Sequence, residues 1–402
     1  MRRPGKGVPL RFVTAPPGLL RSADSASPVV AMHVQTGSPL TLFFCGDVMT
    51  GHGIDPLLHP SELLSPTLRS VTDALQYVRD ASQDDLPLPR PVCFDYPWGD
   101  VLGLLRREQP DLRLVNLEAT ITARGTPVAT RAHTRLPPQH LPILAALGVD
   151  GVVLANHHAL DWGEGGLDDT LAALRQAGIT GVGAGHDRVE AEQEAQWLVP
   201  GKARIRVFAF GHASSGLPAD WAANEDHPGI GWLDALDDTT VARIGQRILA
   251  TRNEGDIVVV SLHWGGGWGY EVSAEQRSFA HALVDEAGVD IVWGHGSHHP
   301  RPIEVYHGRL ILYGIGDFQG ENRNAEHGNF RPDLAAMYLP CVAPDGSLRE
   351  LRLWPLRVHL FRLKRASAGD SYWLARTLSD AGTELGTTLE MQGDGSLRLA
   401  WH

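Results

Sequence analysis

The sequence predicts an α/β fold whose strands are buried, and two patterns along the chain carry that prediction. From Leu40 onward, short apolar runs alternate with longer amphipathic stretches. The runs are apolar at nearly every position, which is typical of strands that are covered on both faces. Regular alternation of such strands with helices is typical of an α/β domain.

The individual elements follow from these patterns. The apolar runs predicted as strands are residues 40–46, 111–118, 151–156, 205–211, 256–265, 289–296 and 309–318. In the amphipathic stretches, apolar residues recur at the three- and four-residue spacing of one helix face. These predicted helices are residues 71–81, 141–148, 165–178, 241–255 and 273–288.

Three segments are expected along the chain. Residues 1–38 are rich in proline, serine, glycine and alanine and lack periodicity, so we expect a flexible arm. Residues 39–325 hold the alternating pattern and form the main domain. Residues 326–402 differ in texture, with a helical stretch and a hairpin at 387–401 that turns at Asp-Gly. We expect this last segment to be an α+β appendage packed on the main domain.

The composition disfavours several classes of partner. The formal net charge of −12 at pH 7 opposes binding to nucleic acid or anionic membranes, since both are polyanions. The N-terminal stretch begins basic but lacks the sustained apolar core of a signal peptide, and no apolar run is long enough to span a bilayer. The three cysteines are too few and too scattered for a disulfide framework. We therefore expect a cytoplasmic protein.

Side chains of the types that can bind metals follow the last apolar residue of most predicted strands. They are Asp47, Asn116, Glu118, Asn156, His157, His158, His263, His295, His298, His299 and Asp317. In α/β folds, the carboxyl ends of the strands form the rim where ligands bind. Carboxylates and imidazoles are the ligands of divalent and transition metals. One histidine at a strand end is usually structural, but several such ends together predict a metal site.

The number of these residues predicts two ions. Asp47 and Glu118 supply carboxylate oxygens from separate strands, and His295 and His298 are three residues apart in a glycine-containing turn. A single ion needs only about four to six ligands, so we expect Glu118 to bridge a pair. These ligand types suit manganese, iron, zinc or cobalt, and the sequence does not distinguish among them.

Several stretches of the chain resemble the CapA family, whose members belong to the calcineurin-like metallophosphatase superfamily. In the family's order, these stretches are GDVMTGHGID (46–55), LVNLEATIT (114–122), LANHHALDWGEGGL (154–167), SLHWGGGWGYE (261–271) and GHGSHHPRPIEVYHGRLILYGIGDF (294–318). The resemblance extends from about Leu40 through the C-terminal segment. It implies a four-layer αββα sandwich with a two-metal site at one sheet edge.

The resemblance also implies roles for individual residues. Two sets of metal ligands would be bridged by Glu118. The first set is Asp47 and His298, and the second set is His157, His263 and His295. His158 matches the acid/base histidine of the superfamily.

The chain departs from the family pattern at several positions. Family members usually have Asn-Asn-His where this chain has Asn156-His157-His158, so an imidazole replaces an amide. They usually have GRGID where this chain has His52, which removes a guanidinium suited to phosphate or carboxylate. Gly267 replaces the asparagine of HWGxNWG, and the Asp-x-His opening of the superfamily ends here in Met49. Loss of the arginine disfavours routine hydrolysis of phosphate esters.

Four residues are candidates for contact with a substrate. His133 and Arg135 lie where family members carry a substrate-contacting loop, and the alternative is a solvated loop. Trp264 and Trp268 are expected either to pack in the core or rim or to form an aromatic shelf for the substrate.

Three residues besides His158 are candidates for proton transfer or its support. His52 is either a surface histidine or a second proton carrier, and His295 could serve in that role only if it does not bind metal. Asp161 is expected to orient a neighbouring histidine or to cap the helix that begins near Glu164, rather than to bind metal.

A metal-dependent peptide epimerase is the favoured function. Members that act in poly-γ-glutamate capsule assembly are usually tethered at the cell surface, and no tether is evident in this sequence. Untethered CapA-like proteins include a branch associated with epimerising the C-terminal residue of a lasso-peptide precursor. Two cations could stabilise the charge that forms when an α-proton leaves, with His158 and either His52 or His295 on opposite faces.

Two other functions are compatible with the same residues. One is a hydrolase or ligase-accessory role on γ-glutamyl polymers or phosphoesters, and the other is a non-catalytic binding module with a degraded site. The expected partner is a peptide or glutamyl substrate, with neither nucleic acid nor membrane. Nothing in the sequence indicates the oligomeric state.

Overall fold

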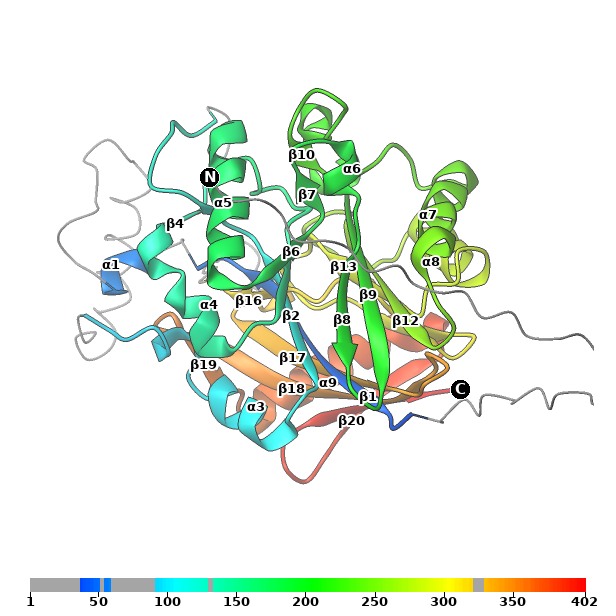
Figure 1. Cartoon of the computed structure of the whole chain (residues 1–402). Coiled ribbons are helices and arrows are strands. Elements are labelled where there is room, and N and C mark those ends of the chain that lie inside the picture. Colours follow the sequence, from blue (N-terminus) through cyan, green and yellow to red (C-terminus); the bar gives the residue numbers. More distant parts are fainter. Residues whose placement is uncertain (1–36, 51–53, 59–90, 129–132, 321–328) are drawn as a thin grey trace, which may run out of the picture. The chain divides into compact units, whose positions relative to one another are not determined.

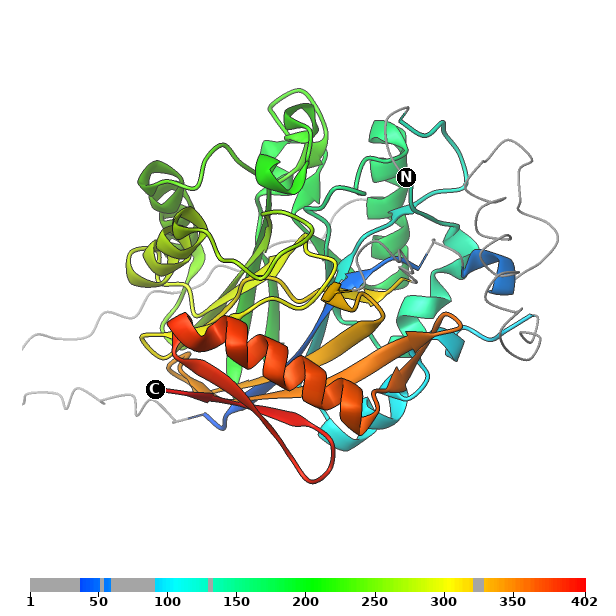
Figure 2. The same cartoon turned by 180° about the vertical axis from the view of Figure 1, so that it is seen from behind.

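The computed structural model describes residues 37–402 except 51–53, 59–90, 129–132 and 321–328. Within these residues, two large β-sheets lie between two groups of helices (Figures 1 and 2). Two predictions fall on residues that are not described. The flexible arm lies outside the described residues except for its last two positions, and so does the helix predicted over 71–81.

The first sheet has ten strands, with β1 near its middle. Its order is β20 (Thr387–Met391), β21 (Leu397–Trp401), β18 (Leu348–His359), β17 (Leu334–Val342), β1 (Leu40–Val48), β2 (Leu112–Leu117), β5 (Gly151–Val153) and β6 (Thr180–Val182). Two further strands pair off this path, β16 (Asp317–Gln319) with β1 and β19 (Arg362–Arg365) with β18. Neighbouring strands among β1, β2, β5 and β6 pair in parallel. On the other side of β1, each pair of neighbours from β1 through β17, β18 and β21 to β20 is antiparallel.

The second sheet has seven strands. Its order is β11 (Trp232–Leu233), β9 (Ala203–His212), β12 (Asp256–His263), β13 (Ile291–His295), β15 (Arg309–Leu312) and β14 (Ile303–Tyr306), with β8 (Ala195–Val199) paired to β9. Two small ribbons join β3 (Thr120–Ile121) to β4 (Arg135–Leu136) and β7 (Ala184–Gly185) to β10 (Gly229–Ile230). The strands predicted from apolar runs are confirmed except for the run 309–318, which was predicted as one strand and forms two, β15 in the second sheet and β16 in the first.

The helices cover the outer faces of the two sheets (Figure 1). Beside the first sheet lie α3 (Val101–Glu108), α4 (Pro142–Leu147) and α5 (Gly163–Ala177). Beside the second lie α7 (Asp238–Thr251) and α8 (Ala274–Asp285). The described residues also form the short helices α1 (Asp55–Leu58) and α6 (Arg188–Ala191) and the C-terminal α9 (Ala368–Gly382).

Burial on both faces explains why the strands are continuously apolar. In β12, Val258, Val260 and Leu262 pack in the cluster that contains α7 and α8. Their neighbours Ile257 and Val259 point the other way, into the large core cluster shared with the first sheet. Successive side chains of a strand face opposite sides, so each face of this strand needs apolar residues. The predicted four-layer αββα arrangement is thereby confirmed.

The C-terminal segment is part of the first sheet. The sequence predicts that residues 326–402 form an appendage on the main domain, with a hairpin at 387–401. The hairpin is confirmed as β20 and β21. However, β17 pairs directly with β1, from Leu40 opposite Val342 to Phe44 opposite Tyr338. No boundary in the sheet therefore separates this segment from the main domain, because backbone hydrogen bonds join the two.

The ends of the strands meet at one place. Along β1, Asp47 lies opposite Asn116 of β2 and opposite Asp317 of β16. In the second sheet, His263 at the end of β12 lies opposite His295 at the end of β13. This register collects the polar ends of the apolar strands, as expected for the ligand-binding rim of an α/β fold.

A glycine allows the chain to cross between the sheets at this point. After β15 the backbone leaves the second sheet and enters the first as β16, and the amide of Asp47 donates a hydrogen bond to the carbonyl of Gly316 (3.0 Å). A Cβ atom on Gly46 would lie 1.7 Å from that carbonyl oxygen. Only glycine permits so close an approach.

We predict that Gly46→Ala destabilises the protein by about 3 kcal/mol, because the added methyl must displace a buried backbone segment. Urea unfolding measures this loss. The matched control is Gly165→Ala in α5, where a Cβ meets nothing within 4 Å. That control should be neutral or stabilising by up to about 1 kcal/mol, and equal effects of the two changes would contradict the role of Gly46.

Candidate metal centre

Asp47 is the central carboxylate contributed by the first sheet. Its side chain is buried, with 1% exposed. Asn116 donates a hydrogen bond from Nδ2 to Asp47 Oδ1 (2.8 Å), and Asn156 in turn donates from Nδ2 to Asn116 Oδ1 (2.9 Å). A chain of two strand-end amides therefore holds the carboxylate in place.

His263 and His295 come from the second sheet and face the first. Their rings lie nearly parallel, with centroids 6.4 Å apart, as neighbours on adjacent strands. His295 Nδ1 is 3.0 Å from Asp47 Oδ1, so a hydrogen bond joins the two sheets at their carboxyl ends. That contact brings imidazoles from one sheet to carboxylates from the other.

Glu118, His157 and His263 form the metal-type cluster found among the described residues. Their candidate ligand atoms all lie within 4.8 Å of one another. Glu118 Oε1 is 3.4 Å from His263 Nε2 and 3.6 Å from His157 Nδ1, and the two ring nitrogens are 2.7 Å apart. One carboxylate oxygen and two imidazole nitrogens thus converge on one point.

The donor atoms of this region fit divalent cations. Several buried atoms have no hydrogen-bond partner among the described residues. They are both carboxylate oxygens of Glu118, Asp47 Oδ2, His263 Nδ1 and His295 Nε2. Buried polar atoms are normally satisfied, and carboxylate oxygens together with imidazole nitrogens are the ligands that first-row divalent metals prefer. A bound cation would satisfy the unpaired acceptors.

The pKa shifts within the cluster also favour binding of a cation. Burial raises the pKa of the Glu118 carboxyl well above its ordinary value, and nearby carboxylates, Asp47 foremost, raise it further. Burial lowers the pKa of His263 well below its ordinary value, and neighbouring imidazoles, His157 foremost, lower it further. A neutral imidazole is the form that binds metal, and a cation would favour the ionised form of Glu118.

His298 lies beside Asp317, a strand-end candidate in the sequence that was not assigned to either set of ligands. His298 Nδ1 is 3.1 Å from Asp317 Oδ1, and the charge of Asp317 raises the pKa of His298 to about 9 despite burial. Asp317 follows an apolar run in the same way as the chosen ligands do. The signal that identifies it was therefore present in the sequence.

His158 and Asp161 form a separate pair within the turn after β5. His158 Nδ1 is 2.6 Å from Asp161 Oδ2, and both side chains are buried. The amide of Thr134 also donates to Asp161 Oδ2 (2.7 Å), and the Thr120 hydroxyl donates to the carbonyl of His158 (2.7 Å). The pair is thus fixed from several sides. The ring of His158 lies 4.3 Å from that of His157, so it adjoins the metal-type cluster.

The predicted substrate residues have different surroundings. Trp264 is 1% exposed and donates from Nε1 to the carbonyl of Tyr313 (3.1 Å), so it packs in the core. Of the two alternatives given for Trp264, core packing is the one observed, because the end of β12 directs this ring between the sheet and α8, against Phe279. Trp268 is half-buried, with its ring 5.2 Å from that of His298.

The loop that carries His133 and Arg135 packs beside the turn of Asp161. The His133 ring contacts the carbonyl of Val128, and the Arg135 guanidinium stacks 4.6 Å from the centre of the Trp162 ring. Both residues are half-buried. The other predicted proton carrier, His52, lies outside the described residues.

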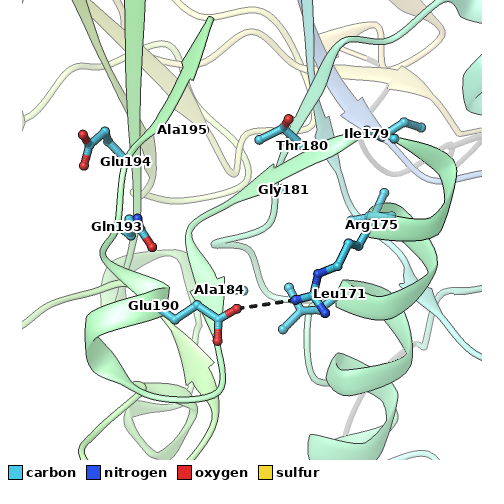
Figure 3. Close-up of a pocket in the computed structure, with 12 residues that line it drawn as sticks. Leu171, Arg175, Ile179, Thr180, Gly181, Ala184, Glu190, Gln193, Glu194 and Ala195 are labelled. Atoms are coloured by element: carbon cyan, nitrogen blue, oxygen red, sulfur yellow. Dashed lines mark ion pairs between the residues drawn. The ribbon is translucent and has the colours of Figure 1, made fainter. Parts of the chain in front are cut away.

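A hollow of about 440 Å³ lies away from these residues, between α5, β6 and the segment around α6 (Figure 3). Arg175 and Glu190 face each other across it at 3.9 Å. Its lining residues are Leu171, Leu174, Arg175, Gly178, Ile179, Thr180, Gly181, Ala184, Glu190, Gln193, Glu194 and Ala195. None of them belongs to the strand-end cluster, so the hollow is not part of the candidate metal centre.

The model of the family described as bacterial capsule synthesis protein PGA_cap matches residues 41–321, a span that contains every residue of the cluster. The chain belongs to this family. It is 41% identical over 377 residues to a probable polyglutamine synthesis accessory protein of Mycobacterium tuberculosis, covering 90% of this chain and 97% of the relative.

More distant matches cover less of the relatives. The PGA biosynthesis protein CapA of Bacillus subtilis is 31% identical over 186 residues, which is 46% of this chain and 46% of that protein. Among solved structures, a 5'-nucleotidase precursor from Thermus thermophilus aligns with a TM-score of 0.43 and 14% identity, covering 86% of this chain and 59% of the other. In the described part of this chain, no helix is both long and apolar enough to cross a membrane.

We predict that the protein binds divalent metal through the cluster. His263→Ala and Glu118→Gln should each weaken binding of manganese or zinc at least about tenfold, since each removes a ligand. Titration calorimetry and elemental analysis of the purified variants measure the change. His186→Ala is the control, because this half-exposed histidine pairs with Glu190 outside the cluster. Unchanged metal content in both ligand variants would contradict the assignment.

We also predict that Glu118→Gln stabilises the metal-free protein at neutral pH. A carboxyl group whose folded pKa is raised contributes stability below its unfolded pKa, about 4.3, and loses that contribution as the pH rises through the folded pKa. At pH 7 the free energy of unfolding of Glu118→Gln, which carries a neutral amide, should therefore exceed that of the wild type by about 1 kcal/mol or more.

Thermal unfolding in chelator at pH 7 and pH 4 measures this difference, which should shrink at the lower pH. Glu350→Gln, which changes a carboxylate with 36% of its side chain exposed, is the control and should show no such gain. A Glu118→Gln variant that is less stable than wild type at both pH values would refute the expectation.

Proposed function

We propose that this protein is a metal-dependent hydrolase that cleaves glutamyl amide bonds in a polyglutamate chain. The observation that carries the proposal is the His158–Asp161 pair beside the Glu118–His157–His263 cluster. Such an arrangement offers one positioned proton donor next to a set of metal ligands. The family, and the relatives named for polyglutamine synthesis and PGA biosynthesis, support the polymer as substrate.

The contact with Asp161 determines what His158 does. Its Nδ1 faces the carboxylate at 2.6 Å, so Nδ1 carries a proton and Nε2 is the nitrogen that gains and loses the second one. Because Thr134 also donates to Asp161 Oδ2, the carboxylate is fixed in the position from which it can accept from the imidazolium. A histidine held in this way is suited to general acid–base catalysis.

Hydrolysis uses these residues in one sequence of bond changes. Water adds to the amide carbonyl, the carbon–nitrogen bond breaks, and the departing amine takes a proton from His158. A divalent cation held by Glu118, His157 and His263 would supply Lewis-acid chemistry that makes a carbonyl more electrophilic and water more acidic. His158 regains its proton from the water that was added, so the enzyme returns to its starting state.

Peptide epimerisation is the second candidate, and the surplus of histidines favours it. Inversion needs an acid/base group on each face of the α-carbon. His158 could serve one face. His295 is the other candidate among the described residues, but its Nδ1 is 3.0 Å from Asp47 within the ligand region. Hydrolysis needs only the one histidine–carboxylate pair and therefore ranks first.

We predict that the metal-loaded protein releases shorter chains or free glutamate from poly-γ-glutamate. Release should stop with chelator, and His158→Ala should lower its rate by about 10²- to 10⁴-fold without reducing metal content, since it removes the proton donor alone. Chromatography of the products measures the rate, and His186→Ala is again the control.

The same incubation in deuterated water separates the candidates. Cleavage without deuterium at the α-carbon supports hydrolysis. Deuterium at the α-carbon of intact peptides, with no cleavage, would reject it in favour of epimerisation. A protein that binds the polymer and changes neither bond would be a binding module, and both catalytic proposals would fail.

A further inference from the structure

Arg301 is a buried cation for which the described residues supply no counter-ion. It follows His298 by three residues and is 4% exposed. One guanidinium nitrogen, Nη2, donates to the carbonyl of Glu271. The other two, Nε and Nη1, are buried without a hydrogen-bond partner in the described part of the chain. Burial lowers the pKa of Arg301, but the ordinary value for arginine is so high that the group stays charged.

A second buried arginine of the same molecule, Arg206, is fully paired, in contrast to Arg301. Arg206 is also 4% exposed, yet its Nε pairs with Asp256 (2.6 Å) and its Nη1 pairs with Glu194 (2.9 Å). A buried charge without a partner is strongly destabilising. The fold therefore neutralises one buried guanidinium with two carboxylates, and the same physical reasoning requires a negative charge near Arg301.

A second buried donor points to the same place. Gln276, in the first turn of α8, is 5% exposed, and its Nε2 has no partner among the described residues. A Cβ atom on Gly265 would lie 2.6 Å from Gln276 Nε2 and 3.3 Å from Arg301 Nη1. The two donors thus flank the bare backbone of Gly265, at a helix N-terminus whose dipole also favours negative charge.

We propose that Arg301 and Gln276 bind a small anion, a halide or a carboxylate group, against Gly265. The site is distinct from the metal-type cluster and does not depend on the proposed hydrolysis. The unpaired groups that face it are donors, namely the guanidinium of Arg301 and the side-chain amide of Gln276. An anion there would supply the missing counter-charge and the missing acceptor together.

The anion would stabilise the loop that borders the metal centre. Residues 265–271 are held by the Ser214 hydroxyl, which accepts from the amide of Gly265 (2.8 Å), and by the amide of His298, which donates to Gly267 (3.0 Å). Arg301 holds the far end of the loop at Glu271. Occupancy would therefore link residues that follow His263 to residues that follow His298.

Thermal unfolding of the full-length protein tests the proposal. Sodium chloride and sodium formate are compared with sodium isethionate, a bulky reference, at equal ionic strength and with and without chelator. We expect a saturable rise in Tm of a few degrees with the small anions. Arg301→Gln should lose this rise, whereas Arg376→Gln, which changes an arginine with 69% of its side chain exposed, should keep it.

The outcomes separate the sources of the anion. A response to chloride alone supports a halide site, and a response to formate as well supports one that accepts carboxylates. No response to either anion, or an equal response in Arg301→Gln, would overturn the proposal. Anomalous diffraction from crystals of the unaltered protein in sodium bromide is independent of any variant. A bromide peak beside Arg301 and Gln276 supports the site, and its absence there contradicts it.

Discussion

The candidate metal centre depends on the meeting of two sheets at their carboxyl ends, where His295 is hydrogen-bonded to Asp47. Each sheet alone offers an incomplete set of ligands. Carboxylates come from the first sheet and most of the imidazoles from the second. The backbone of Asp47 is also fixed in place, because the strand that carries it pairs with β2, β16 and β17. Core packing on both sides of β1 therefore also determines the geometry of the site.

Burial of these charged groups destabilises the folded protein, and a bound cation would offset that destabilisation. Glu118 is fully buried, and its oxygens have no hydrogen-bond partner among the described residues. Its raised pKa reflects both burial and the carboxylates around it. Groups collected in this way oppose folding when they are charged and alone. Natural proteins accept such local instability at functional sites, where the rest of the core compensates for it.

The adjacent histidines of the turn after β5 have separate surroundings. His157 faces Glu118 and His263, and therefore belongs to the ligand cluster. His158 faces Asp161, which also accepts a hydrogen bond from the amide of Thr134. One turn of chain thus contributes both to the metal-type cluster and to a histidine–carboxylate pair.

The sequence alone determined most of the strands and the chemical character of the site, since continuous apolar runs predict buried strands and most of these runs end in a polar residue of metal-binding type. It did not determine which strands share a sheet. The pairing of β1 with β17 joins residues about 300 positions apart and leaves no local pattern. Nor did it separate Trp264, which is buried, from Trp268 beside His298. Only the tertiary structure decided these points, because hydrogen bonding and burial depend on which distant segments come to lie against each residue.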